Sequence, residues 1–175
     1  KVYLGEWASR TRTYESALAE AMHLCSLERN GDVVAMSSYA PLLCKEGHHN
    51  WNPDLIYFNN DTITSLTPSY EVQRIWGNSV GDQYVSSHID IDENLRYRVA
   101  SSVVKDRKSG KTYIKLVNAL PSQVTLKVQG IVIPDGASQE EYIGKVTDRK
   151  VSSVKGKSSG RIQSLPPYSV RIIEI

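Results

Sequence analysis

The feature that most constrains the fold is a change in the spacing of apolar residues near residue 82. Before that point, apolar residues recur at helical spacing between short apolar strands. After it, apolar and polar residues alternate, as they do from Val124 through Leu126 to Val128. Because alternation is typical of half-buried strands, the sequence predicts an α/β region over residues 1–81 and an all-β region over residues 82–175.

The α/β region has the order strand, helix, strand, loop, helix. An apolar stripe from Leu18 to Cys25 indicates the first helix, and Thr67 before Pro68 is a typical start for the second. A short strand that is apolar on both faces predicts a parallel sheet covered by helices, so strand–helix–strand reads as a βαβ unit. The predicted strands cover residues 2–5 and 33–36, and the helices cover residues 14–29 and begin again at residue 67.

The all-β region contains several short strands separated by turns, which favours an antiparallel two-sheet sandwich. The segment 107–111 predicts a hairpin turn, and residues 145–161, rich in Lys, Ser and Gly, predict an exposed hairpin or a mobile loop. The expected core of this sandwich contains Val99, Val103, Leu116, Leu126, Val128 and Ile172.

Composition excludes several classes of partner. The net charge is only +2, and the basic segment 145–161 contains no aromatic residue between its Lys and Arg side chains. No nucleic-acid partner is therefore expected. No apolar run approaches the roughly 20 residues of a membrane helix, so no membrane partner is expected either. The chain opens at Lys1, which we interpret as a cut N-terminus, and two cysteines do not define a redox compartment, so localisation stays open.

A carboxylate stands where the first strand ends. Glu6 follows Gly5 and precedes Trp7. If the strand belongs to a (β/α) barrel, its carboxyl end is where such enzymes place catalytic groups, and an indole beside a carboxylate suits sugar recognition. Taken alone, the pattern is more typical of a solvated loop carboxylate than of a catalytic one.

Six segments in order give the sequence a specific resemblance. They resemble the nucleophile strand, the following helices, the eighth strand and a loop near the active site of the α-L-arabinofuranosidases of glycoside hydrolase family 51. The segments are residues 3–8 (YLGEWA), 18–21 (LAEA), 27–34 (LERNGDVV), 38–42 (SYAPL), 51–58 (WNPDLIYF) and 67–73 (TPSYEVQ). Residues 82–175 resemble that family's C-terminal domain more loosely, by position and strand pattern.

The resemblance implies a fold and an activity. It implies the final βαβα portion of a (β/α)8 barrel over residues 1–81, with a jelly-roll-like β-sandwich over residues 82–175. It also implies a retaining exo-glycosidase that removes terminal arabinofuranosyl residues from hemicellulose or pectin, with Glu6 as the nucleophile. The family's acid/base carboxylate lies on an earlier strand that has no counterpart here, so we expect the chain alone to be inactive. We also expect its βα segment to be disordered or shielded by a second copy, which makes a homo-oligomer an open possibility.

Other residues are candidates for binding an arabinose-containing oligosaccharide or polysaccharide. Trp7 and Trp51 are candidates to line the sugar site, although Trp51 can equally serve loop packing. Asn52 and Asp54 can bond sugar hydroxyls, although Asp54 can equally cap a local turn. Tyr39, at the end of the second strand, can reach the same site.

No cofactor and no metal are expected. His48 and His49 are adjacent, but no third ligand stands at a known metal-binding spacing. Two alternatives to the enzyme fragment remain: the sandwich binds carbohydrate by itself, or it is a purely structural module of another retaining glycosidase.

Overall fold

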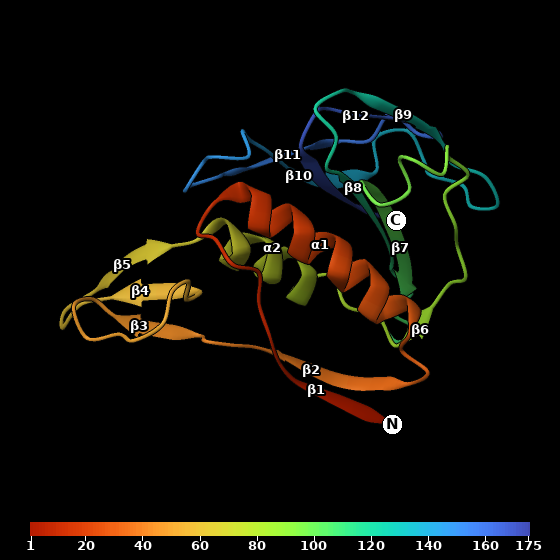
Figure 1. The fold of residues 1–175 in the computed structure, drawn as a ribbon. Coiled ribbons are helices and arrows are strands. Elements are labelled where there is room, and N and C mark those ends of the chain that lie inside the picture. The colour runs from red at the N-terminus through yellow and green to blue at the C-terminus, as the bar shows by residue number, and fades with distance from the viewer.

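The structure is a computed structural model that describes all 175 residues. It contains two helices and thirteen strands, arranged in layers (Figure 1). The elements are β1 (Val2–Trp7), α1 (Tyr14–Arg29), β2 (Val34–Tyr39), β3 (Leu43–Lys45), β4 (Ile56–Phe58), β5 (Ile63–Leu66), α2 (Pro68–Gly77), β6 (Gln83–Tyr84), β7 (Val99–Lys105), β8 (Thr112–Asn118), β9 (Val124–Lys127), β10 (Ser138–Ile143), β11 (Ser153–Lys157), β12 (Ile162–Leu165) and β13 (Ser169–Glu174).

The C-terminal half is built on a six-stranded antiparallel sheet in the order β11-β10-β13-β8-β7-β6. The predicted hairpin turn joins β7 to β8, and no helix occurs after α2. Strand β8 lies in the middle of the sheet, and all seven of its residues are buried.

The large sheet is covered on both faces because its apolar residues point alternately to opposite sides. One face carries Val104, Val117 and Ile172 against α1 and α2. The other packs against the smaller β9–β12 sheet and its flanking loops. Of the predicted core residues, Val99, Val103, Leu116 and Ile172 are buried, and Leu126 and Val128 pack half-buried against the second cluster.

Helix α1 has the predicted bounds and is held by the sheet region at both ends. Thr13 makes no side-chain cap; instead the first-turn amides of Tyr14 and Glu15 donate to the carbonyls of Asp148 and Val146 at 2.8 and 3.0 Å. Helix α2 begins as predicted, with the Thr67 hydroxyl accepting from the Tyr70 amide at 3.2 Å. A helix whose orphan amides are satisfied by another part of the chain depends on that part for its stability.

A buried ion pair joins α1 to the middle of the sheet. Lys115 of β8 has no exposed side-chain surface, and its ammonium donates to the Glu28 carboxylate of α1. The hydroxyl of Ser102 donates to the other Glu28 oxygen at 2.5 Å. Burial lowers the pKa of Lys115, and the charge of Glu28 opposes that shift. Helix α1 therefore packs as part of the sandwich core.

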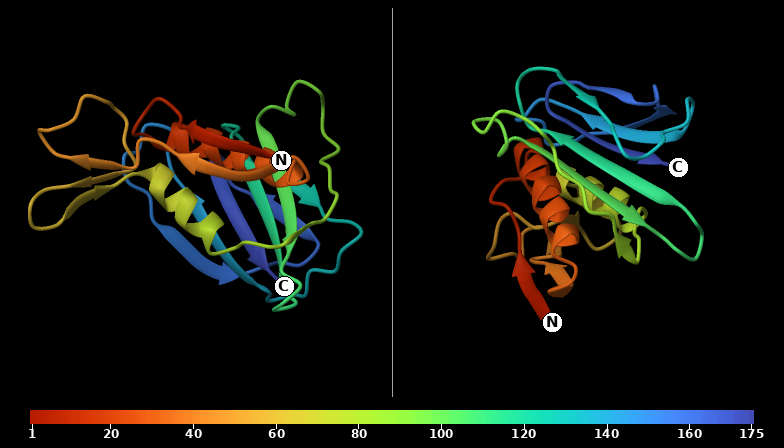
Figure 2. Two further views of the ribbon diagram at one scale, coloured as in Figure 1. Left: turned by 90° about the horizontal axis from the view of Figure 1, so that it is seen from below. Right: turned by 90° about the vertical axis from the view of Figure 1, so that its right-hand side faces the viewer.

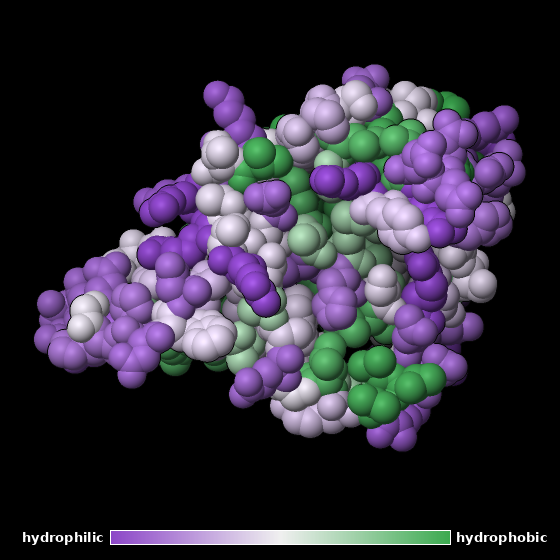
Figure 3. All heavy atoms as spheres, in the orientation of Figure 1, coloured by the Kyte–Doolittle hydropathy of each residue, from purple (hydrophilic) through white to green (hydrophobic).

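Strands β1 and β2 form a separate, two-stranded parallel sheet. The expected fully buried strand at residues 33–36 is wrong for this chain, since Met36 is 59% exposed and Val33 is 49% exposed. On β1, Val2 and Tyr3 are about half exposed. A green apolar patch is visible at the bottom of the molecule, where these strands lie below the helices (Figure 3). These strands have no further neighbour in the sheet, so their apolar side chains stay in water.

The segment between β2 and α2 was expected to be a loop, and this is also wrong. It forms a three-stranded sheet in the order β3-β4-β5 that projects sideways from the molecule (Figure 2). Strands β3 and β4 have three residues each and pair in parallel across the loop between them. Such short strands leave too little alternation to be detected in a sequence.

The structure thus has the predicted fold class, a βαβα portion followed by an antiparallel β-sandwich. The shared core means that the proposed division at residue 82 separates two sequence patterns rather than two independently packed bodies. Neither helix has the length and apolar character needed to cross a membrane.

Candidate functional site

The carboxyl ends of β1 and β2 bring three of the predicted residues to one edge. The strands are parallel, so they end on the same side, and Trp7 is the register partner of Tyr39. The register advances by three residues in β1, from Leu4 to Trp7, against two in β2, which places an irregularity at Gly5 and Glu6. Bulges of this kind re-aim side chains and are common next to active sites.

Glu6 itself is exposed, and none of the ion pairs of the chain involves it. Trp7 beside it is half-buried and packs edge-on against two rings, with centroids 4.7 Å from His23 and 5.6 Å from Tyr39. The edge therefore offers a free carboxylate next to a fixed aromatic cluster.

A second carboxylate, Glu20 of α1, contacts the segment that follows β1. It was not identified as a candidate residue from the sequence. Its side chain is 2% exposed, and its Oε1 accepts from the backbone amide of Ser9 at 3.0 Å. Burial raises the pKa of Glu20, and the hydrogen bond from Ser9 opposes that shift. The detectable sign was a charged residue at helical spacing from Ala17 and Leu24, both of which are buried.

Three buried polar atoms around Glu20 lack hydrogen-bond partners: Glu20 Oε2, Trp7 Nε1 and His23 Nε2. Their residues line a hollow of about 220 Å³ at the end of β1. Buried polar groups are normally paired, so this hollow suits a bound water or a polar side chain.

The remaining predicted residues lie on the loop between β3 and β4. Trp51 is 64% exposed and Asn52 is exposed, whereas Asp54 is only 3% exposed. Tyr57 organises the base of the loop, because its hydroxyl accepts from the Asp54 amide at 2.9 Å and donates to Asn52 Oδ1 at 3.2 Å. Burial of Asp54 favours the supporting role over direct sugar contact.

The loop returns beside the end of β2. The amide of Leu55 donates to the carbonyl of Pro41 at 3.2 Å, and the guanidinium of Arg12 lies 3.5 Å from the centre of the Tyr57 ring. Since Arg12 follows β1 and Pro41 follows β2, the segments after both strands meet the loop that carries Trp51 and Asn52.

The base of this loop also contains a set of possible metal ligands. One ligand atom each from Cys44, His49 and Asp54 lies within 4.8 Å of the other two. The expectation of no metal rested on the lack of a third ligand for His48 and His49. The fold supplies two further groups near His49, at a spacing that matches no known motif.

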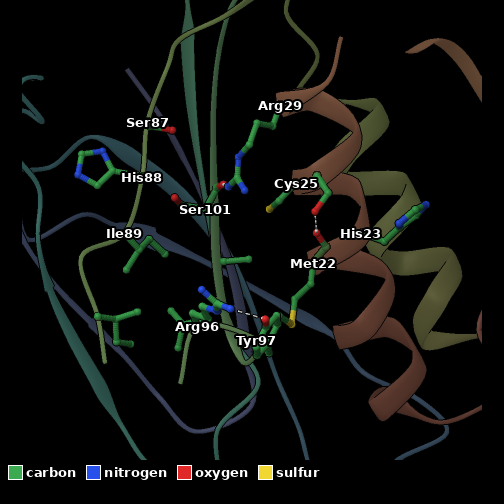
Figure 4. Close-up of a pocket in the computed structure, with 14 residues that line it drawn as sticks. Met22, His23, Cys25, Arg29, Ser87, His88, Ile89, Arg96, Tyr97 and Ser101 are labelled. Atoms are coloured by element: carbon green, nitrogen blue, oxygen red, sulfur yellow. Dashed lines mark hydrogen bonds between the residues drawn. The ribbon is translucent and has the colours of Figure 1, made fainter. Parts of the chain in front are cut away.

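A large cleft, of about 600 Å³, lies elsewhere, between α1 and the segment before β7. Figure 4 shows Cys25 and Arg29 of α1 on one side of it and Ser87 on the other, while the His23 ring points away. None of the predicted site residues lines this cleft.

Comparison with known proteins agrees with the resemblance. The profile of the family described as "Alpha-L-arabinofuranosidase C-terminal domain" matches residues 5–169. An extracellular exo-α-L-arabinofuranosidase of Streptomyces chartreusis is 47% identical over 87 residues, covering 50% of this chain and 10% of the relative. α-L-Arabinofuranosidase A of Aspergillus niger is 29% identical over 180 residues, covering 98% of this chain and 29% of the relative.

A solved structure gives the same result in three dimensions. The arabinose-bound structure of a family 51 α-L-arabinofuranosidase, MgGH51, superposes with a TM-score of 0.78 and 26% identity. The match covers 94% of this chain and 28% of that one, so the chain spans less than a third of these relatives' lengths. With the profile matching nearly the whole chain, the protein belongs to the α-L-arabinofuranosidase C-terminal domain family.

Proposed function

We propose that this chain is the C-terminal portion of a retaining exo-acting α-L-arabinofuranosidase and that Glu6 is the catalytic nucleophile. The observation that carries the proposal is the position of Glu6: an exposed carboxylate at the irregular carboxyl end of a parallel strand, beside Trp7 and Tyr39. Catalytic groups of barrel enzymes occupy this end of their strands.

In the proposed reaction, the Glu6 carboxylate attacks the anomeric carbon of a terminal arabinofuranosyl residue. The glycosidic oxygen leaves with a proton from a second carboxylic acid, and the sugar is held as an ester on Glu6. Water, deprotonated by that second group, then attacks the same carbon and releases arabinose with retained configuration. The two carboxyl groups of such a pair stand roughly 5 Å apart.

The other residues of this edge have supporting roles in the proposal. Trp7, Trp51 and Asn52 are accessible for contact with sugar, Tyr39 packs against Trp7, and Asp54 holds the loop from within. The substrate class is an oligosaccharide or polysaccharide that carries arabinose. One solved relative contains arabinose, which supports this choice.

The chain alone is proposed to be inactive because the acid/base group is missing and because two strands do not enclose a pocket. In the full barrel, further strands would pair with β1 and β2 and would cover their exposed apolar residues. Residues 1–81 would then be the end of the catalytic barrel and residues 82–175 the sandwich that buttresses it.

The experiment is to replace Glu6 by Ala in the full-length enzyme and to measure hydrolysis of an aryl α-L-arabinofuranoside. Turnover should fall by several orders of magnitude, and azide should restore part of it while giving the arabinosyl azide of inverted configuration. Glu15→Ala, at an exposed carboxylate on the first turn of α1, is the control and should keep normal turnover. Near-normal turnover of Glu6→Ala would remove Glu6 from the mechanism.

A sandwich that binds glycan by itself is the competing function. The exposed aromatic ring near the large cleft is Tyr97, and the Arg96 guanidinium already covers it at 4.7 Å from the ring centre. We therefore favour the structural role. Retention of this chain on an arabinan-containing affinity gel, abolished by Tyr97→Ala, would reverse that choice.

A further inference from the structure

We propose that Cys44, His49 and Asp54 form a zinc site that anchors the loop between β3 and β4. The three side chains approach one another from a strand and a loop, with one ligand atom of each within 4.8 Å of the others. Thiolate, imidazole and carboxylate are the three ligand types that protein zinc sites use, and three protein ligands with one open position is a common arrangement.

Two of the three ligands are buried, and their side chains form neither a disulfide nor an ion pair. Cys44 is 2% exposed and forms no disulfide, and Asp54 is 3% exposed. Asp54 Oδ2 has no hydrogen-bond partner, and Asp54 takes part in none of the ion pairs of the chain. Because a buried carboxylate is costly unless it is paired or bound to a metal, this oxygen is well placed to bind a cation beside the Cys44 thiol.

The third ligand, His49, is already oriented by a hydrogen bond to the backbone. His49 Nδ1 lies 3.0 Å from the carbonyl oxygen of Trp51. A carbonyl only accepts, so Nδ1 carries the proton, and Nε2 of the neutral ring keeps its lone pair. Metal-binding histidines are typically fixed in this way by a carbonyl or carboxylate.

The geometry needs a small closure. Bond lengths of 2.0–2.3 Å around tetrahedral zinc imply ligand–ligand separations of about 3.3–3.8 Å, so the set must contract by up to about 1.5 Å. His49 is exposed on the loop and can make this movement, while Cys44 is fixed in β3 by its pairing with Tyr57. On binding, the Cys44 thiol proton passes to the buffer and the open position is left for water.

One feature opposes cation binding. Arg12 stacks on Tyr57, and its positive charge acts on Cys44. The thiolate and carboxylate together neutralise a bound Zn²⁺, so the loaded site would be neutral, whereas the empty site with a thiol and a carboxylate carries one negative charge. Ca²⁺ and Mg²⁺ prefer oxygen ligands, so the mixed set of sulfur, nitrogen and oxygen ligands favours Zn²⁺ over both ions.

The test uses the 175-residue chain, stripped of metal, with Zn²⁺ titrated against a chromophoric chelator and Co²⁺ as a spectroscopic probe. We expect one zinc per chain and, with Co²⁺, a sulfur-to-metal charge-transfer band together with tetrahedral d–d bands. Cys44→Ser should remove the charge-transfer band, and His49→Gln should weaken zinc binding at least tenfold. The matched control is His48→Gln, which alters the neighbouring exposed imidazole and should leave both readouts unchanged.

Three outcomes would overturn the site. They are no zinc binding above a protein-free blank, an equal loss of affinity in His48→Gln and His49→Gln, and a charge-transfer band that survives in Cys44→Ser. His49 is exposed, so His49→Gln keeps the core intact, and circular dichroism of each variant confirms that the fold is retained. The readouts do not involve hydrolysis, so they are independent of the proposed role of Glu6.

Discussion

Strands β1 and β8 belong to the same chain but are buried to very different extents. β8 lies between β13 and β7, has layers on both faces, and buries every residue, including the charged Lys115. β1 pairs only with β2 and leaves Val2 and Tyr3 about half exposed. This happens although the first three residues of β1 are all apolar or aromatic, whereas β8 begins with a threonine. Burial is therefore decided by the neighbours that a strand finds, and apolar sequence alone does not provide them.

Helix α1 belongs to the β8 side of this comparison, although it precedes β2 in the chain. Its apolar stripe, its partly buried Glu28 and its first-turn amides all find partners in the sandwich. Substitutions at the contacts between α1 and the sandwich should therefore change the stability of the chain more than substitutions on β2 do.

The largest effect is expected from Glu28→Ala. It leaves the Lys115 ammonium buried without its partner, which typically costs about 3–5 kcal/mol. Burial already lowers the pKa of Lys115, and loss of Glu28 removes the charge that opposes this shift. Between the folded and the unfolded pKa the unfolded chain binds more protons, so stability should rise with pH through that window.

Urea denaturation of the variant at pH 7 and at pH 9.5 measures both effects. The control is Glu174→Ala, which breaks the half-exposed pair with Lys111 and should change stability much less, because water already screens that pair. Equal losses of stability in the two variants would mean that the ion pair between α1 and β8 stabilises the chain no more than the exposed pair does.

The next effect compares apolar truncations on the two sides. Leu18 of α1 is 2% exposed in the shared core, so Leu18→Ala should destabilise the chain by about 2–5 kcal/mol. Met36 of β2 is 59% exposed, and Met36→Ala should change stability by less than about 0.5 kcal/mol. Thermal unfolding of both variants provides the measurement. A large loss in Met36→Ala would show that β2 is covered in solution, for example by a second copy of the chain.

The smallest effect concerns Glu20, which joins the two sides by supporting the end of β1 from α1. Burial raises its pKa above 4.5, so above pH 4.5 the folded state holds the proton more tightly, and the chain loses stability as pH rises through this window. Glu20→Gln removes the buried charge and should stabilise the chain at pH 7 on the order of 1 kcal/mol. The difference from wild type should shrink as the pH falls to 4.5, and a difference independent of pH would contradict the assignment.

Sequence reasoning succeeded where the evidence was local. The stripe from Leu18 to Cys25 and the Thr67–Pro68 start gave the helices, and alternation gave the sandwich strands. It failed where partners decide the outcome. The apolar run at residues 33–36 is exposed, and the short β3–β5 sheet depends on pairing across a loop.

The candidate site divides in the same way. Glu6, Trp7 and Tyr39 were chosen as candidates because strand ends can be recognised in a sequence, and the fold brings Trp7 and Tyr39 into register. Helical spacing could mark Glu20 as a charged residue on the buried face of α1, but not its contact with Ser9. That contact and the approach of Cys44 to Asp54 arise from tertiary packing, and neither spacing is a known motif.

Hydrogen exchange of the 175-residue chain, resolved by residue, tests the central claim most directly. We expect the amides of α1 to exchange as slowly as those of β8, and the amides of β1 and β2 to exchange much faster, since the first two share a core and the last two form an isolated pair. Slow exchange throughout residues 14–29 together with fast exchange at residues 2–7 is the predicted result. Protection of β1 equal to that of β8, or exchange of α1 as fast as that of β1, would contradict it.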